Sequence, residues 1–279
     1  MQLKTGFLFL FCCTTIADMH PFRTRFTKDI VAEFLPPLLG ARRGRRGSRK
    51  GDRAVIYCAG MPGMPSKSAL EFFARKGYWA FAPRYRGSWE SGGKFLRHSP
   101  ARDIKDVIDG IHRPFRDAFT GKRYRLRPKE IVLVGSSFGG PAVLLNSRDR
   151  RVSKVIAFSP VVDWTDPSKE EPIATFWSVV RDAFGEGYRF DKKDWDKLQN
   201  GKFYNPAGNL KKIDGRKIFV LHAKDDRVVG FHAVKKFTEK IGAQSLFLAR
   251  GGHLGSKALL ETRAWKRIQR FLKARRIVY

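Results

Sequence analysis

The chain has 279 residues, of which 42% are apolar and 13% aromatic. This length and composition suit one globular domain and exclude a disordered chain. Its 56 Lys and Arg against 26 Asp and Glu give a formal net charge of +30, so we expect a surface that attracts polyanions. The three cysteines, Cys12, Cys13 and Cys58, fit neither a disulfide framework nor a metal-binding motif.

An apolar stretch at residues 6–17 follows Lys4 near the N-terminus. It is too short to cross a bilayer but resembles the hydrophobic part of a secretory signal. We expect residues 1–25 to be a signal-like segment or a misassigned start, and residues 26–279 to form the domain. Because the cysteines suit a reducing compartment, we predict a cytoplasmic protein, with export as the alternative.

Short apolar runs alternate with helical stretches along most of the chain. The predicted strands span residues 29–35, 54–58, 78–83, 131–135, 152–158, 217–222 and 245–249. The predicted helices span residues 66–76, 101–111, 138–146, 231–241 and 256–273. This alternation is typical of an α/β domain with a mostly parallel central sheet flanked by helices.

Three segments do not follow the alternation. Residues 41–51 form an Arg/Gly-rich loop, and residues 113–129 form a basic insert. Residues 165–214 are rich in Phe, Trp and Tyr and are too long for a bare loop. We expect this last segment to form a small helical cap over one end of the sheet.

The sharpest motif is Gly-Ser-Ser-Phe-Gly at residues 135–139, between a predicted strand and a predicted helix. A serine on such a tight turn, with glycines two residues before and after it, is the nucleophile elbow of an α/β-hydrolase fold. The helix N-terminus adds a partial positive charge that favours an oxyanion. The spacing selects Ser137 as the nucleophile.

A serine hydroxyl needs a base to take its proton and a carboxylate to orient that base. In this fold the acid and then the histidine follow the serine along the chain. Three histidines precede Ser137, namely His20, His98 and His112. His222 ends a predicted strand and His232 begins a helix, which leaves His253, on a Gly-Gly loop past the last strand, as the predicted base.

Two adjacent carboxylates compete for the role of the acid, on the loop after residues 217–222. Counting four residues on from His222 favours Asp226, whereas counting two back from Arg227 favours Asp225. We take Asp226 as the acid and keep Asp225 as the alternative.

The oxyanion of an acyl-transfer reaction needs two backbone N–H donors. One comes from Phe138, directly after the nucleophile. The other comes from the loop after residues 54–58, where Gly and Pro open the turn, and Met61 is the candidate.

These features resemble the prolyl-oligopeptidase-like serine peptidases and the dienelactone-hydrolase-like esterases. The resemblance is carried by the elbow and by residues 84–95, 103–110 and 225–228. It implies the same fold and the same Ser-His-Asp arrangement. It also implies that Arg227 contacts a substrate carbonyl oxygen, as a similar residue does in some members.

The sequence therefore predicts a serine hydrolase that cleaves an ester or peptide bond through an acyl-enzyme, without a metal or organic cofactor. Its expected partner is a small ester or a short peptide, with non-specific polyanion contacts through the basic surface. The alternative is a protein that binds nucleic acid or a membrane surface through the basic residues at 42–50 and 122–129.

Overall fold

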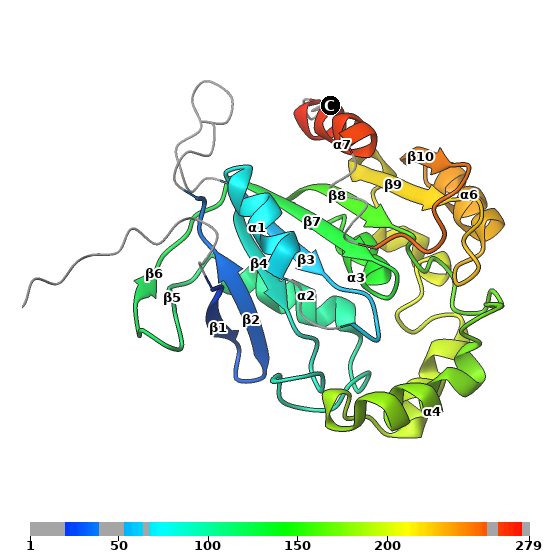
Figure 1. The fold of residues 1–279 in the computed structure, drawn as a ribbon, viewed down its shortest axis with the longest axis horizontal. Helices are drawn as coiled ribbons and strands as arrows, with labels where there is room; N and C mark the ends of the chain where they lie inside the picture. Colours follow the sequence, from blue (N-terminus) through cyan, green and yellow to red (C-terminus); the bar gives the residue numbers. More distant parts are fainter. Residues whose placement is uncertain (1–19, 39–52, 64–66, 256–261, 275–279) are drawn as a thin grey trace, which may run out of the picture.

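The computed structural model describes residues 20–38, 53–63, 67–255 and 262–274. Within these ranges, eight strands form one sheet in the order β1-β2-β4-β3-β7-β8-β9-β10 (Figure 1). The strands are β1 (Phe22–Phe26), β2 (Ile30–Leu35), β3 (Arg53–Cys58), β4 (Trp79–Pro83), β7 (Glu130–Ser136), β8 (Val152–Phe158), β9 (Ile218–Ala223) and β10 (Gln244–Leu248). From β4 to β10 all neighbouring strands are parallel, whereas β2 runs antiparallel to both β1 and β4.

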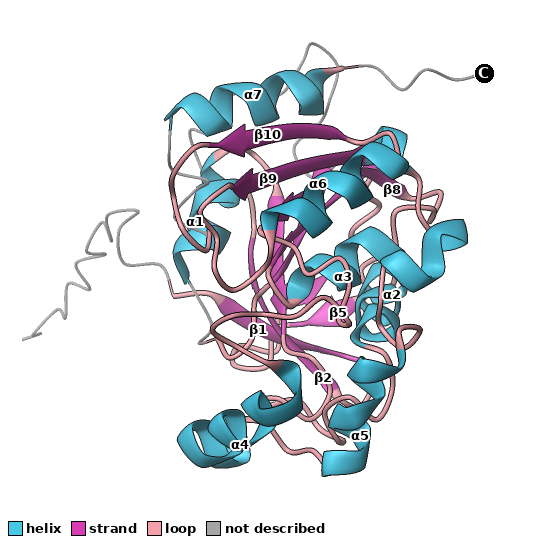
Figure 2. Ribbon diagram, turned by 90° about the vertical axis from the view of Figure 1, so that its right-hand side faces the viewer, coloured by secondary structure: helices cyan, strands magenta, loops and turns pink. Residues whose placement is uncertain are grey.

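Helices cover both faces of the sheet (Figures 1 and 2). The main ones are α1 (Lys67–Arg75), α2 (Pro100–Gly110), α3 (Gly139–Leu145), α6 (Phe231–Lys240) and α7 (Thr262–Lys273). Alternate residues of each strand point to opposite faces. In β3, Val55 and Tyr57 belong to the core beneath α1 and α7, and Ala54 and Ile56 to the core beneath α2, α3 and α6. These two apolar layers hold the sheet rigid.

The predicted α/β alternation is confirmed, and the ends of the elements differ from the predicted ends by at most one residue where both can be compared. The sheet begins earlier than expected, because β1 starts before residue 26 and pairs with β2. The basic insert at 113–129 contains a small hairpin, β5 (Phe115–Arg116) and β6 (Arg123–Tyr124). Its aromatic rings pack against Phe34 of β2.

The expected insertion between β8 and β9 is helical. It contains α4 (Ile173–Phe184), η2 (Gly185–Gly187), α5 (Lys192–Asp196), η3 (Lys197–Asn200) and η4 (Ala207–Lys212). A further short helix, η5 (Gly215–Lys217), follows the insertion and leads into β9. Trp195 is completely buried, and its indole N–H donates to the Ile173 carbonyl at 2.7 Å. The Tyr204 hydroxyl donates to the Phe138 carbonyl at 2.6 Å. The insertion is thereby joined to the start of α3.

Several predictions fall partly or wholly outside the described residues. They concern the apolar stretch at 6–17, the Arg/Gly loop at 41–51 with its basic residues at 42–50, the first residue of the helix at 66–76 and the first part of the helix at 256–273. Among the helices that are described, none is long and apolar enough to cross a membrane.

Candidate active site

Ser137 occupies a strained turn between β7 and α3. Its φ is 49°, in the left-handed region that non-glycine residues seldom adopt. The Ser137 N–H donates to the Phe158 carbonyl at 3.0 Å, and the Ser137 carbonyl accepts from the Gly140 N–H at 2.9 Å. These bonds to β8 and α3 maintain the strained conformation.

The two glycines of the motif are required by close packing. A Cβ atom on Gly135 would lie 2.5 Å from the Gly139 carbonyl oxygen, and one on Gly139 would lie 2.2 Å from the Cys58 carbonyl oxygen. Both distances are far below van der Waals contact. A larger residue at either position would push α3 away from the ends of β3 and β7, and with it the serine.

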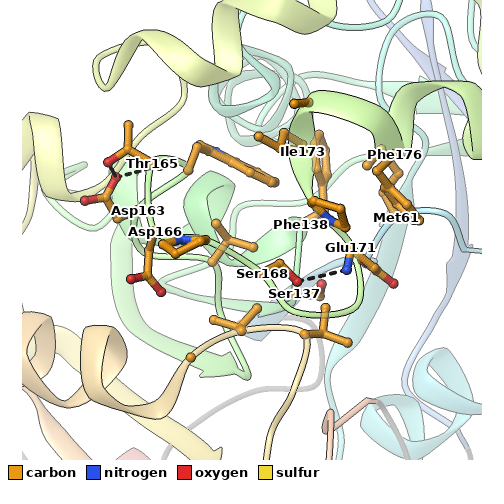
Figure 3. A pocket seen from close by; sticks show the side chains of 18 residues that line it. Met61, Ser137, Phe138, Asp163, Thr165, Asp166, Ser168, Glu171, Ile173 and Phe176 are labelled. Carbon is orange, nitrogen blue, oxygen red and sulfur yellow. Dashed lines mark hydrogen bonds between the residues drawn. The ribbon is translucent and has the colours of Figure 1, made fainter.

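Ser137 lines a cavity of about 240 Å³ (Figure 3). The other walls come from Met61 after β3, from Val228 and Val229 after β9, and from the insertion. The insertion and the segment leading into it contribute Val161, Asp163, Trp164, Thr165, Asp166, Pro167, Ser168, Glu171, Pro172, Ile173, Ala174 and Phe176. The cavity can hold a small organic group next to the serine.

His253 and Asp226 form a direct pair. Nδ1 of His253 lies 2.9 Å from Oδ2 and 3.1 Å from Oδ1 of Asp226. Oδ1 also accepts the backbone N–H groups of Val228 at 3.0 Å and Val229 at 2.9 Å. Burial alone would raise the pKa of Asp226, but the bonds from His253 and Val229 outweigh it, so the pKa is lowered. Asp226 is therefore held as a carboxylate facing the imidazole.

Asp225, the alternative acid, makes a different set of contacts. It accepts the backbone N–H groups of Gly251 at 3.2 Å and Gly252 at 2.9 Å. These bonds fix the loop that carries His253 rather than the imidazole itself. The structure thus brings Asp226 and not Asp225 to His253. Within the described residues, the Ser137 hydroxyl makes no hydrogen bond to His253. The His253–Asp226 pair is connected to the cavity through Val228 and Val229, which bind Asp226 and line the cavity.

The expected oxyanion donors lie beside the serine. A Cβ on Gly60, one residue before Met61, would lie 3.2 Å from the Ser137 Cβ. Within the described residues, the N–H groups of Met61 and Phe138 donate no hydrogen bond to the protein. Both are free to donate to a ligand in the cavity.

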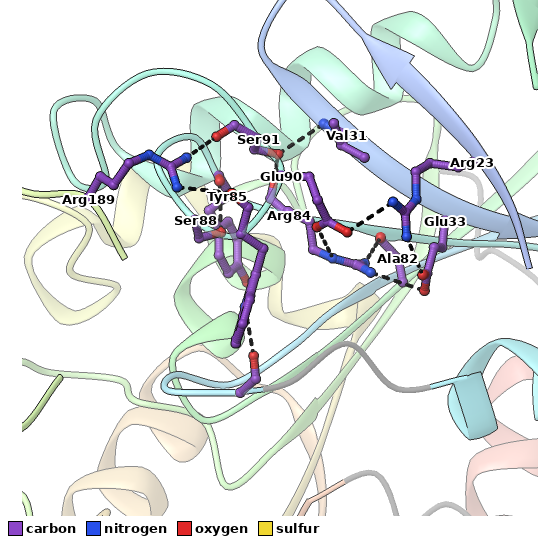
Figure 4. Close-up of polar contacts among 12 residues, drawn as sticks. Arg23, Val31, Glu33, Ala82, Arg84, Tyr85, Ser88, Glu90, Ser91 and Arg189 are labelled. Atoms are coloured by element: carbon purple, nitrogen blue, oxygen red, sulfur yellow. Dashed lines mark hydrogen bonds and ion pairs between the residues drawn. The ribbon is translucent and has the colours of Figure 1, made fainter. Parts of the chain in front are cut away.

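Three aromatic side chains fix the loop that carries Met61. The Tyr85 hydroxyl donates to the Ala59 carbonyl at 3.1 Å, a contact drawn in Figure 4. The Trp89 indole N–H donates to the Gly63 carbonyl at 2.9 Å, and the Tyr188 hydroxyl accepts from the Gly63 N–H at 3.1 Å. The loop conformation next to Ser137 therefore depends on residues 85–89 and on the insertion.

The segment around residues 84–91 is itself held by charged contacts (Figure 4). Arg84 is buried and pairs with Glu33 of β2 at 3.1 Å. Arg86 binds Asp103 and lies 2.7 Å from Asp106, both on α2. Burial raises the pKa of Asp103 to about 6 despite these bonds from Arg86. The charged residues of this segment thus support the site from outside the cavity.

Arg227, the expected substrate contact, has a protein partner. Its Nε lies 2.7 Å from Oε1 of Glu170 on the insertion, and its side chain is 72% exposed. It is not among the residues that line the cavity. The structure therefore places Arg227 in an ion pair between the Asp226 loop and the insertion.

Two supporting residues were not predicted as part of the site. The Ser159 hydroxyl, just after β8, accepts the Leu254 N–H at 3.0 Å and also helps to lower the pKa of Asp226. His222 is completely buried, with Nε2 3.8 Å from the Asp226 carboxylate. Burial lowers the pKa of His222. Their positions at strand ends were visible in the sequence, but their contacts depend on the sheet order.

A mostly parallel sheet between helical layers, with a serine on a strained strand-to-helix turn, defines an α/β hydrolase. Residues 65–274 match the model of the prolyl oligopeptidase family. The chain belongs to this family and is a serine hydrolase. No curated protein matches its sequence significantly.

Solved structures show the same fold. An esterase from Pyrococcus furiosus aligns with a TM-score of 0.61 at 18% identity, over 91% of this chain and 89% of the esterase. A lipase-esterase related protein from Clostridium acetobutylicum aligns with a TM-score of 0.53 at 20% identity, over 81% of this chain and 96% of that protein. The acylaminoacyl peptidase of Pyrococcus horikoshii aligns with a TM-score of 0.56 at 15% identity, over 91% of this chain but only 41% of the peptidase.

Proposed function

We propose that Ser137, His253 and Asp226 act together to hydrolyse a small ester or a peptide bond. The observation that carries the proposal is the strained Ser137 turn in the wall of a cavity that Val228 and Val229 also line, since the N–H groups of these two valines donate to Asp226. The pairing of Asp226 with His253 supports the choice of base and acid.

In the first half of the reaction, the Ser137 hydroxyl attacks the carbonyl carbon while Nε2 of His253 takes its proton. Asp226 accepts the Nδ1–H bond and stabilises the imidazolium. The N–H groups of Phe138 and Met61 bind the oxyanion. The tetrahedral intermediate then collapses, and the leaving group departs with the proton from His253. This leaves an acyl group on Ser137.

In the second half, a water molecule gives a proton to His253 and attacks the acyl-enzyme. The second tetrahedral intermediate releases the carboxylic acid, and the proton returns to Ser137. The insertion acts as a cap, and its Ile173 and Phe176, together with Trp164 just before it, surround the acyl or leaving group.

A pair of neighbouring serines provides the test. Ser137→Ala should lower kcat/KM for p-nitrophenyl butyrate by about 10⁴-fold or more, because it removes the nucleophile. Ser136→Ala, in the adjacent position of the motif, should retain most of the activity. Equal activity of the Ser137→Ala variant and the wild type would disprove the proposal.

A further inference from the structure

The charged side chains that line the cavity are all acidic, whereas the protein as a whole has a positive net charge. Among the described residues that line it, the ionisable side chains are Asp163, Asp166 and Glu171, and none is Lys, Arg or His. The chain as a whole has more than twice as many basic as acidic residues, 56 against 26. The cavity next to Ser137 is therefore a negatively charged site in a positively charged protein.

The three carboxylates differ in what they bind. Asp163 accepts hydrogen bonds from the Thr165 N–H at 3.0 Å and from the Asn205 amide at 2.8 Å, so it stabilises the local turn. Neither Asp166 nor Glu171 forms an ion pair or accepts a side-chain hydrogen bond among the described residues. These two carboxylates remain available to a ligand.

Glu171 is better placed than Asp166 to act on a substrate. Its side chain is half-buried in the wall that also contains Ser137 (Figure 3). Burial raises the pKa of Glu171, and the charge of a protonated His253 opposes this rise. Its neighbour Glu170 instead points to Arg227 and forms an ion pair at 2.7 Å. Glu170 therefore forms an ion pair outside the cavity, whereas Glu171 lines the cavity and forms no ion pair among the described residues.

We infer that Glu171 selects substrates whose acyl or leaving group carries a protonated amine near the scissile bond. This inference rests on the proposed function and names its substrate class. A half-buried carboxylate without a partner favours a cation, because the cation restores the interactions lost with water. An ammonium group donates hydrogen bonds to Glu171 while its carbonyl carbon lies at Ser137. Aminoacyl esters and amides with a free amino group have this chemistry.

The test compares substrates of equal shape and different charge. On the acyl side the pair is p-nitrophenyl 6-aminohexanoate and p-nitrophenyl heptanoate, in which an ammonium replaces a methyl group. On the leaving-group side the pair is 2-(dimethylamino)ethyl butyrate and 3-methylbutyl butyrate, in which a protonated tertiary amine replaces a CH group. The wild type should have a higher kcat/KM for the charged member of at least one pair. Glu171→Gln should lower that charged-to-neutral ratio about tenfold or more, the factor for one hydrogen bond between charged groups.

Glu170→Gln is the matched control, since it changes the adjacent carboxylate outside the cavity and should leave the ratio unchanged. A wild type without preference for the charged member of either pair would overturn the inference. An equal effect of Glu171→Gln on charged and neutral members would also overturn it. The neutral esters distinguish a failure of this inference from a failure of the proposed function. If Ser137 is the nucleophile, the Ser137→Ala variant loses hydrolysis of the neutral esters whether or not Glu171 has a role.

Discussion

The carboxylate of Asp226 lies 2.9 Å from Nδ1 of His253, although the two residues are separated by 26 others in the chain. The adjacent carboxylate, Asp225, binds only the backbone N–H groups of the loop that carries His253. One turn after β9 therefore both orients the imidazole and fixes its loop.

This division of roles predicts unequal effects of two conservative substitutions. Asp226→Asn should lower kcat for p-nitrophenyl butyrate by about 10⁴-fold, because an amide favours the wrong tautomer of the imidazole. Asp225→Asn should lower it by less than about tenfold, because the amide keeps one acceptor oxygen for the N–H groups of Gly251 and Gly252. Steady-state kinetics of both variants decides the matter, and a larger loss in Asp225→Asn would reverse the assignment of the acid.

A second prediction concerns the loop that carries Met61. Tyr85→Phe removes the only side-chain donor that the described residues give to the Ala59 carbonyl, and should lower kcat about tenfold with little change in KM. The cause is a less ordered oxyanion donor. The Tyr78 hydroxyl is buried without a hydrogen-bond partner among the described residues, so Tyr78→Phe is a matched control that should leave kcat unchanged. Equal kcat values for the two variants would show that Tyr85 does not support the loop.

A third prediction concerns stability in acid. Arg151 binds Asp149 through Nε at 3.0 Å and Nη2 at 2.7 Å, and these bonds lower the pKa of Asp149 to about 2. A carboxylate with a lowered pKa stabilises the fold above its unfolded pKa of about 3.9 and loses this effect as the pH falls towards the folded pKa. Asp149→Asn should therefore be less stable than the wild type at pH 6.

The same substitution gives a pH-dependent comparison. The difference in free energy of unfolding between the wild type and Asp149→Asn, measured by urea denaturation, should shrink as the pH is lowered from 5 to 3. A difference that stays constant over this range would show that the Asp149 carboxylate and Arg151 do not stabilise the fold through charge.

The sequence predicted what depends on local geometry. The glycines around Ser137 and the apolar runs of β3, β7 and β8 are local signals, so the fold and the serine turn could be inferred directly. The spacing from His222 favours Asp226 over Asp225 only weakly, because two adjacent residues on a turn point in different directions and the position of the His253 loop decides between them. The family resemblance implies a substrate contact for Arg227, and the sequence does not reveal its ion pair, because Glu170 is 57 residues earlier in the chain and meets it only in the folded protein.

Some structural elements gave too weak a signal. The strands β5 and β6 have two residues each, and their position depends on rings that pack against Phe34. Glu171 lies in a charged stretch of the insertion, and nothing in its sequence neighbourhood distinguishes it from Glu170. The strand β1, Phe-Arg-Thr-Arg-Phe, has an arginine at every second position, but its first four residues fall within the N-terminal segment expected at residues 1–25.

The most direct test of the central claim is the site of covalent labelling by a fluorophosphonate. The reagent forms a stable adduct only with an activated serine, and peptide mass spectrometry identifies the modified residue. We predict one phosphonyl group on Ser137, retained in Ser136→Ala and lost in Ser137→Ala together with ester hydrolysis. An adduct on a different residue, or an unlabelled Ser137 in an enzyme that still turns over esters, would contradict the account.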